Sequence, residues 1–261
     1  MLHALSSLPK LSIRALDGEI GSVKDSYFDD HRWVLRYIVV DTGHWLPGRE
    51  VLISPYSVSG IDWERRLLDL SITRGQVKSS PSIDMAKPVS RQQEAAFLDY
   101  YNYPYYWGGM MPWGVSASPA ITRPPPSIED ERQIAEQRAQ AEHADPHLRS
   151  TKHVTGYHIE ANDGRIGHVD DFIIDEQTWE LRYFVVDTRN WLPGRHVLLA
   201  TDWIDEVSWD ERVVRVPLSR AAIRTSPEWH EQEMLEESEE QSLHRHYGKT
   251  LEPGIRGGQL R

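Results

Sequence analysis

Histidines and carboxylates are the side chains most able to perform acid–base or metal chemistry in this chain, which has 12 histidines and no cysteine. The run His230-Glu231-Gln232-Glu233-Met234 departs from the zinc-protease pattern at its last position. His244 and His246, and His143 with His147, have spacings that metal ligands use, but Pro146 interrupts a helix through the second pair. His244 and His246 also suit the carboxyl end of a helix. These patterns predict neither a metal site nor a cofactor.

The rest of the sequence offers no better candidate for catalysis. It contains no phosphate-binding glycine loop, no Gly-x-Ser-x-Gly elbow and no dinucleotide fingerprint. Without cysteine there are no disulfides, thiolate zinc sites or cysteine nucleophiles. The net charge of -11 disfavours a nucleic-acid surface. No apolar run is long enough for a signal peptide or a membrane span. We therefore expect a non-enzymatic, cytoplasmic protein.

An aromatic tract is the first candidate for a partner surface. It runs from Tyr100 to Trp113 and contains glycine and proline between its rings. Such residues provide contact area at low entropic cost, but they can equally pack against the adjacent domain and close its core. Stacking on single-stranded nucleic acid would need interleaved Arg or Lys, which Tyr100–Gly114 lacks. The candidate binding residues of the tract are Tyr103, Tyr105, Tyr106, Trp107 and Trp113.

A loop that occurs twice is the second candidate. Asp41-Thr42-Gly43-His44-Trp45-Leu46-Pro47-Gly48-Arg49 recurs 146 positions later as Asp187-Thr188-Arg189-Asn190-Trp191-Leu192-Pro193-Gly194-Arg195. Its frame is repeated while its tip changes, which predicts a structural frame and a tip free to specialise. The predicted frame comprises Asp41, Pro47, Gly48, Arg49, Asp187, Pro193, Gly194 and Arg195. The predicted binding residues are His44, Trp45, Arg189, Asn190 and Trp191.

Each frame arginine has two possible roles. Arg49 and Arg195 could form a functional ion pair with Asp41 and Asp187, but we favour contacts with a carboxylate or with carbonyls that hold the Pro-Gly bend. Likewise, each loop tryptophan could stack on a ligand, but we favour a hydrophobic plug over the end of its domain.

The match at this offset extends well beyond the loop. It runs without a gap from Asp17-Gly18 over Asp163-Gly164 to Tyr101-Asn102 over Tyr247-Gly248. Each copy is longer than a solenoid repeat, so the sequence predicts an internal duplication of one small domain.

Strand patterns dominate both copies. Asp-Gly turns precede alternating segments, and Trp33–Val40 is apolar on both faces, as a central strand requires. Six short antiparallel strands in about 60 residues favour a small closed barrel, because closure removes exposed edges; an open sandwich is the alternative. A helix is expected over Ser90–Tyr101, capped by Ser90 and stopped at Asn102. A longer helix is expected after Ser226, with Pro227 in its first turn.

The predicted domains follow from these patterns. They are a first barrel over 1–80, a helix and aromatic tract over 81–114, a Pro-rich linker and charged helix over 115–150, a second barrel over 151–226, and a C-terminal helix and tail over 227–261.

Two motifs resemble the PRC-barrel family. They are Asp-Gly-x-Ile-Gly-x-Val-x-Asp at Asp17 and Asp163, and Trp-x-Leu-Arg-Tyr-x-Val-Val-Asp-Thr at Trp33 and Trp179. The family is named after the cytoplasmic domain of the photosynthetic reaction centre H subunit, and it includes a ribosome maturation factor and stand-alone bacterial proteins. The resemblance implies a mainly β fold with flanking helices, made of two small PRC-type barrels related by duplication.

The resemblance also implies a function. We expect a binding or scaffold protein with an unidentified protein partner, associated with a photosynthetic or other membrane complex on its cytoplasmic side, in assembly or electron-transfer tuning. Peripheral membrane association and a homo-oligomer are compatible with this. An RNA-processing or ribosome-assembly adaptor, or a metal- or small-molecule-binding protein, are the alternatives; DNA is not expected as a partner, and the acidic balance disfavours RNA.

Overall fold

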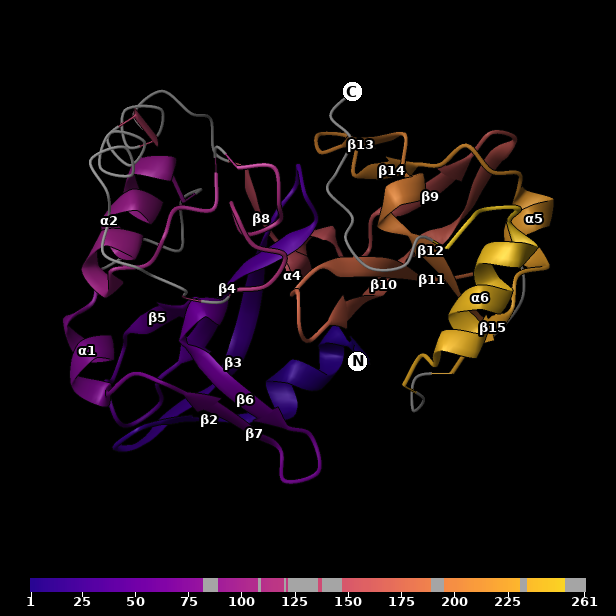
Figure 1. Cartoon of the computed structure of the whole chain (residues 1–261). Coiled ribbons are helices and arrows are strands. Elements are labelled where there is room, and N and C mark those ends of the chain that lie inside the picture. Colours follow the sequence, from indigo (N-terminus) through magenta and orange to yellow (C-terminus); the bar gives the residue numbers. More distant parts are fainter. Residues whose placement is uncertain are drawn as a thin grey trace. The chain divides into compact units, whose positions relative to one another are not determined.

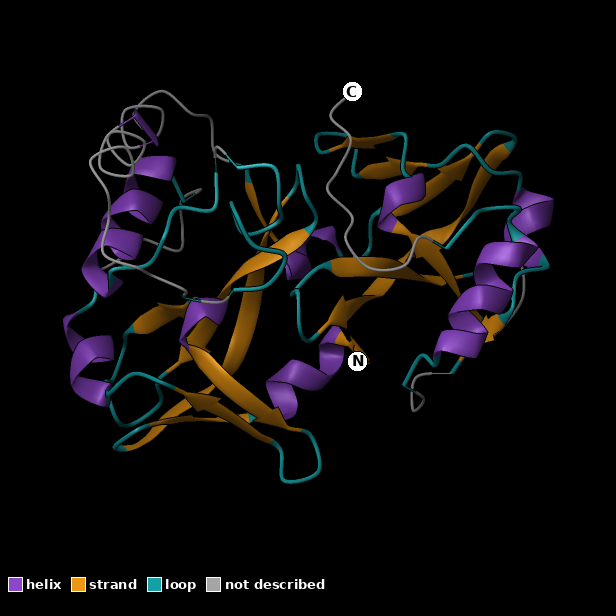
Figure 2. Ribbon diagram, in the orientation of Figure 1, coloured by secondary structure: helices purple, strands orange, loops and turns teal. Residues whose placement is uncertain are grey.

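The computed structural model describes residues 1–81, 89–107, 109–119, 121, 136–137, 147–188, 195–230 and 234–251. The chain divides into two compact units: the first unit is Leu8–Ser150, and the second unit is Met1–Ser7 with Thr151–Arg261. Each contains one mixed sheet with short helices beside it (Figures 1 and 2). The mainly β fold class predicted from the sequence is confirmed.

The sheet of the first unit has seven strands in the order β5-β4-β3-β2-β7-β6, with β8 paired to β3. Its strands are β2 (Ser12–Ala15), β3 (Gly18–Asp29), β4 (Val34–Asp41), β5 (Glu50–Ile53), β6 (Val58–Asp62), β7 (Leu67–Leu70) and β8 (Leu148–Ser150). Its helices are η2 (Pro55–Ser57), α1 (Arg74–Ser79) and α2 (Arg91–Tyr101), and η1 (Leu5–Lys10) precedes β2.

The sheet of the second unit has eight strands in the order β13-β14-β9-β10-β11-β12-β15, with β1 paired to β10. Its strands are β1 (Leu2–Ala4), β9 (His158–Ala161), β10 (Gly164–Asp175), β11 (Leu181–Asp187), β12 (His196–Ala200), β13 (Glu206–Ser208), β14 (Val213–Arg215) and β15 (Glu228–Trp229). Its helices are α4 (Thr151–Val154), η3 (Thr201–Trp203), α5 (Arg220–Arg224) and α6 (Glu237–His246).

The central strands explain why the core forms where it does. Val34 to Val40 of β4 are all buried, because this strand is covered on both faces and lies between β3 and β5. The equivalent strand β11 pairs in the same way with β10 and β12. Trp33 was expected to begin the strand, but it lies in the preceding turn with a φ of 55° and its ring stacks on Phe28.

Each sheet is completed by a strand that the sequence assigns to the other copy. Leu2 of β1 pairs with Asp175 of β10, and Leu148 of β8 pairs with Asp29 of β3. Both pairs obey the offset of 146 positions, so the correspondence between the copies begins earlier than the sequence motifs indicate. Residues 1–7 therefore belong to the second unit, not to the predicted domain over 1–80, and Leu148–Ser150 is a strand of the first unit rather than part of a linker.

The expected all-antiparallel closed barrel differs from the sheets observed. Strand β2 pairs in parallel with β7, and β9 pairs in parallel with β14. The 3-10 turns η2 and η3 redirect the chain after β5 and β12, so that the next strand joins the opposite end of the sheet. Among the described strands, no pairing joins β5 to β6 to close the path.

The two predicted helices have different outcomes. Helix α2 begins after the capping box of Ser90 and ends at Asn102, which has the left-handed conformation expected of a stop. The helix expected after Ser226 begins only at Glu237. Before it, Trp229 pairs with His196 in the sheet and is 5% exposed, so burial of the indole outweighs the local helix signal of Ser226 and Pro227.

Candidate functional site

The loop after β4 is held by hydrogen bonds within the loop itself. The hydroxyl of Thr42 donates to the carbonyls of Leu46 and Arg49, at 2.7 Å in each case, and a carboxylate oxygen of Asp41 accepts from the backbone of Gly43. In the second copy, the hydroxyl of Thr188 donates to the carbonyl of Arg195 at 2.9 Å. The threonine that follows each aspartate, which the predicted frame did not contain, therefore also holds the loop.

The frame arginines contact carbonyls, as favoured, but in a different segment of the chain. Arg49 donates to the carbonyls of Lys78 and Ser80, both at 2.6 Å, at the end of helix α1. Arg195 donates to the carbonyl of Ser226, which corresponds to Ser80. Each arginine thus ties the start of a strand to the end of the following helical turn.

The predicted binding residues at the loop tip are only partly described. His44 is exposed, and the half-buried ring of Trp45 lies under the guanidinium of Arg74 at 4.8 Å, beside the sheet. In the second copy, Arg189, Asn190, Trp191, Pro193 and Gly194 lie outside the described residues.

The aromatic tract is part of the core of the first unit. Its five candidate binding residues are all buried: Tyr103 (6%), Tyr105 (7%), Tyr106 (2%), Trp107 (9%) and Trp113 (2%). Tyr103 shares a hydrogen bond with Ser57 at 2.6 Å, and Trp113 packs edge-on against Tyr56. The prediction that these rings form a partner surface is corrected: they close the core, because so much apolar area is more stable covered by the sheet and α2 than in water.

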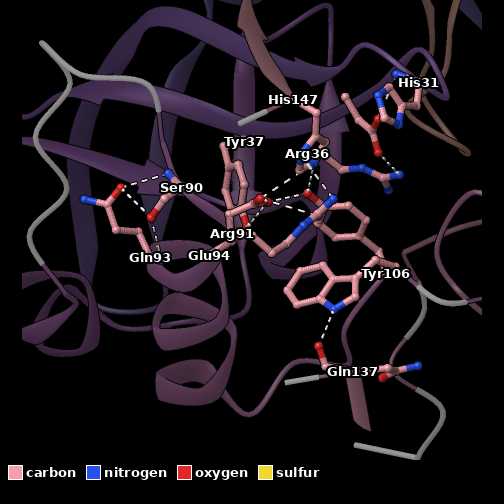
Figure 3. Close-up of polar contacts among 12 residues, drawn as sticks. His31, Arg36, Tyr37, Ser90, Arg91, Gln93, Glu94, Tyr106, Gln137 and His147 are labelled. Atoms are coloured by element: carbon pink, nitrogen blue, oxygen red, sulfur yellow. Dashed lines mark hydrogen bonds and ion pairs between the residues drawn. The ribbon is translucent and has the colours of Figure 1, made fainter. Parts of the chain in front are cut away.

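Beneath the tract lies a buried polar cluster centred on Glu94 of α2 (Figure 3). Its carboxylate accepts hydrogen bonds from the hydroxyls of Tyr37, at 3.2 Å, and Tyr106. The guanidinium of Arg91 lies 3.4 Å from the same carboxylate, and the imidazole of His147 lies 3.7 Å from it. Helix α2, strand β4, the aromatic tract and the residue before β8 therefore converge on one carboxyl group.

A buried arginine adjoins this cluster. Arg36 of β4 is paired with Asp29 of β3 at 3.1 Å and lies 3.7 Å above the ring of Tyr106. Its only hydrogen bond within the described residues is from Nη2 to Asp29, so the rings of Tyr106 and Trp113 cover the rest of the guanidinium. Cation–π contacts here offset part of the cost of burying the charge.

The pKa values of the two carboxyl groups in this region, Glu94 and Asp29, are shifted in opposite directions. Burial raises the pKa of Glu94 to about 7, although Arg91 and Tyr106 oppose the shift. Burial also disfavours the charged form of Asp29, but Arg36 and His147 outweigh it, and the pKa of Asp29 lies below its ordinary value. The cluster can therefore hold a proton on Glu94 while Asp29 stays charged. Both side chains are buried, so the cluster is part of the core of the first unit.

The second unit contains a related contact between α6 and β11. The hydroxyl of Tyr183 donates to Glu240, and the guanidinium of Arg182 lies 3.0 Å from the same carboxylate. The imidazole of His244 lies 3.0 Å from the tyrosine hydroxyl, so this histidine belongs to a buried contact rather than to a metal pair with His246. His246 instead contacts the carbonyl of Ala222 at 2.9 Å.

Glu94, Arg36 and His147 were not predicted to act together. A signal was present, because Arg36, Tyr37 and Glu94 are repeated at the common offset as Arg182, Tyr183 and Glu240. The identity of a buried acid and a tyrosine in both copies could have identified the contact between helix and sheet.

One part of the tract remains exposed. Residues Gly109–Val115, here called the apolar turn, present Met110 and Val115 to solvent at 89% and 94% exposure. Arg32 donates to the carbonyls of Gly109 and Met111, and the backbone of Met111 pairs with that of Gly114. With Trp113 buried at its base, the turn has a fixed conformation and an apolar tip.

These features define a mainly β protein in which a buried tyrosine–glutamate contact joins each sheet to a helix. A family model described as PRC-barrel domain matches residues 159–222, from within β9 to within α5. This segment of the second unit is therefore similar to the PRC-barrel domain family, and such a domain suggests a binding or scaffold role in general. No curated protein matches the chain. In the part of the chain that the structure describes, no helix is long and apolar enough to cross a membrane.

Proposed function

We propose that the protein is a non-enzymatic interaction module whose first unit binds a protein partner through the apolar turn. The observation that carries this proposal is the near-complete exposure of Met110 and Val115 on a backbone fixed by Arg32. Isolated apolar residues on a surface are common. Two of them held together on one short, braced turn form a contact that loses little entropy on binding.

The composition of the turn suits a protein surface. Methionine is flexible and polarisable, and it adapts to apolar grooves of different shape.

The family suggests the class of partner. The resemblance of this chain's motifs to the family of the reaction centre H subunit supports a peripheral role at the cytoplasmic face of a photosynthetic or other membrane complex. The role would be in assembly or electron-transfer tuning. The net charge of -11 favours a basic protein surface over RNA. An RNA adaptor remains the second candidate function, supported only by the other branch of the family.

A pair of matched variants tests the proposal. Met110→Ser with Val115→Ser removes the apolar tip, and Leu16→Ser removes another exposed apolar side chain of the first unit, at 69% exposure. Partners captured from the native lysate by the wild type are identified, purified and titrated against each protein. We expect the double variant to bind at least tenfold more weakly and Leu16→Ser to bind normally.

Two results would count against the proposal. Equal binding by the double variant would exclude the apolar turn as the contact. Salt-dependent binding of RNA by the purified protein, with no protein partner that binds directly, would favour the adaptor function instead.

A further inference from the structure

Four potential metal ligands meet in the second unit where β11 ends and β12 begins. His168 of β10 is the direct cross-strand neighbour of Asp187 in β11, and Asp187 is the direct neighbour of His196 in β12. Directly opposite residues of adjacent strands have their side chains on the same face. The three residues therefore form a row across three strands.

The fourth residue joins this row because the strand is irregular. Asp170 lies at a β-bulge between Val169 and Asp171, and the imidazole of His196 lies 3.2 Å from its carboxylate. The imidazole of His168 lies 3.8 Å from the carboxylate of Asp187. One donor atom from each of His168, Asp170 and Asp187 lies within 4.8 Å of the others.

We propose that these four residues, His168, Asp170, Asp187 and His196, form a binding site for a divalent transition metal ion of the zinc class. Two imidazoles and two carboxylates make a donor set that Zn²⁺ accepts in four-coordinate sites, with bonds of about 2.0–2.2 Å. Such bonds place the donors roughly 3.3 Å apart, so the donors of His168, Asp170 and Asp187, which lie within 4.8 Å of one another, have to move closer together to hold an ion, and His196 lies 3.2 Å from Asp170. This site was not predicted from the sequence, because its members are separated along the chain and meet only through strand pairing.

The equivalent positions of the first unit carry a different set of side chains. The equivalent residues are Ser22, Lys24, Asp41 and Glu50, with the same cross-strand register. There the ammonium of Lys24 forms an ion pair with Glu50. Thus an internal cation balances the carboxylates of the first unit.

The second unit has an acid in place of that cation. Asp170 stands where the first unit has Lys24, and two histidines stand where it has a serine and a glutamate. Two carboxylates close together repel each other, and a bound cation relieves this repulsion. The side chain of Asp187 is fully buried, whereas those of His168, Asp170 and His196 are between 25% and 34% exposed, which leaves an ion a path from solvent.

The role we assign to the ion is to join the ends of β10, β11 and β12. The site lies in the second unit and does not depend on the apolar turn of the first unit. Its test is therefore independent of the proposed partner.

The experiment uses the full chain, stripped with a chelator and titrated with Zn²⁺ by calorimetry and with Co²⁺ by visible absorption. We expect one equivalent of either ion per chain, a tetrahedral Co²⁺ spectrum and a higher Tm for the second unit. His168→Gln with His196→Gln should abolish uptake, whereas the control His153→Gln, which removes an exposed histidine of α4, should not.

A second variant keeps the test decisive if the double variant does not fold. Asp170→Asn changes a half-exposed side chain at the bulge and should weaken Zn²⁺ binding at least tenfold with little change in the Tm of the metal-free protein. No uptake by the wild type, or uptake unchanged in Asp170→Asn, would overturn the proposal. An equal response to Mg²⁺ or Ca²⁺ would overturn the assignment to a transition metal, because those ions prefer oxygen ligands.

Discussion

The two buried tyrosine–glutamate contacts show how one attachment between helix and sheet is built in two surroundings. In the first unit, Tyr37 and Glu94 are covered by the aromatic tract, and Glu94 is completely buried. In the second unit, no such tract covers Tyr183 and Glu240 among the described residues, and the side chains of Glu240 and Arg182 keep 11% and 17% exposure. The additional cover, rather than the contact itself, therefore makes the first cluster electrostatically unusual.

The histidine of each cluster comes from a different place. His244 lies on α6, the same helix as Glu240, whereas His147 directly precedes β8, the strand that completes the first sheet. The first cluster thus depends on a residue more than 50 positions from Glu94, since the hydrogen bond between Arg91 and His147 spans 56 residues. We expect the first cluster to be the more cooperative of the two.

The largest expected difference follows from removing the glutamates. Glu94→Ala leaves two buried tyrosine hydroxyls without their acceptor and Arg91 without its ion-pair partner, and it creates a cavity, so the free energy of unfolding of the first unit should fall by about 3–5 kcal/mol. Glu240→Ala should cost the second unit only about 1–3 kcal/mol, because Arg182 is partly exposed and the hydroxyl of Tyr183 keeps its contact with His244. Hydrogen exchange followed by peptide mass spectrometry separates the units. Equal losses would mean that the extra cover of Glu94 has no energetic effect.

The next effect is a dependence on pH confined to the first unit. The pKa of Glu94 rises from its ordinary value of 4.5 to about 7. Between these values the unfolded chain releases the proton that the folded chain keeps, so stability is greatest below the lower value and falls as pH rises. The total loss is about 3 kcal/mol, at 1.36 kcal/mol per pKa unit. Exchange protection of the first unit measured from pH 4.5 to 7.5 reports it.

The matched control for this dependence is Glu94→Gln, which cannot titrate. Its first unit should keep a nearly constant stability over the same range. A wild-type curve parallel to that of Glu94→Gln would show that Glu94 is already ionised in the folded protein.

A smaller difference is expected at the arginines that follow the repeated loop. Within the described residues, Arg49 donates to two carbonyls and Arg195 donates to one. Lysine cannot reproduce the forked geometry. Arg49→Lys should therefore cost the first unit about 1–2 kcal/mol, and Arg195→Lys should cost the second unit about 1 kcal/mol. Thermal unfolding followed by unit-resolved exchange is the measurement, and a larger loss for Arg195→Lys would contradict this account of the loop.

The smallest effect concerns the starts of the two helices. The hydroxyl of Ser90 accepts from the backbone of Gln93 at 3.3 Å, while Glu236 occupies the equivalent position before α6. Ser90→Ala should destabilise α2 by about 1 kcal/mol. Glu236→Ser should stabilise α6 by a few tenths of a kcal/mol, about the scale of a cap improvement. Exchange rates of the first-turn amides report both changes, which should have opposite signs.

The sequence predicted those parts of the fold that depend on local signals or on the repeat. The capping of α2 by Ser90, its stop at Asn102 and the central position of β4 all follow from short patterns. The tertiary pairings were less accessible. Three-residue strands such as Leu2–Ala4 carry too little pattern to be assigned, and the burial of Trp229 overrode a helix start that Ser226 and Pro227 appeared to specify.

The candidate sites were predictable to a smaller extent. Aromatic composition located the tract correctly, but it could not distinguish a covered ring from an exposed one, so Met110 and Val115 were overlooked beside Tyr106 and Trp107. The row of His168, Asp187 and His196 depends on strand register, which no local pattern specifies.

The pairings of β1 with β10 and of β8 with β3 also determine when each sheet can close during synthesis of the protein. The first sheet can close when Leu148–Ser150 has been translated, directly after the rest of the first unit. The second sheet closes later, because Leu2–Ala4 is translated long before the residues around Asp175 with which it pairs. At about 5–20 residues per second, the interval is roughly 10–35 s. During that time Leu2–Ala4 is unpaired and available to chaperones or to a neighbouring nascent chain. The second sheet is complete only when this strand meets the β10 residues that are translated later.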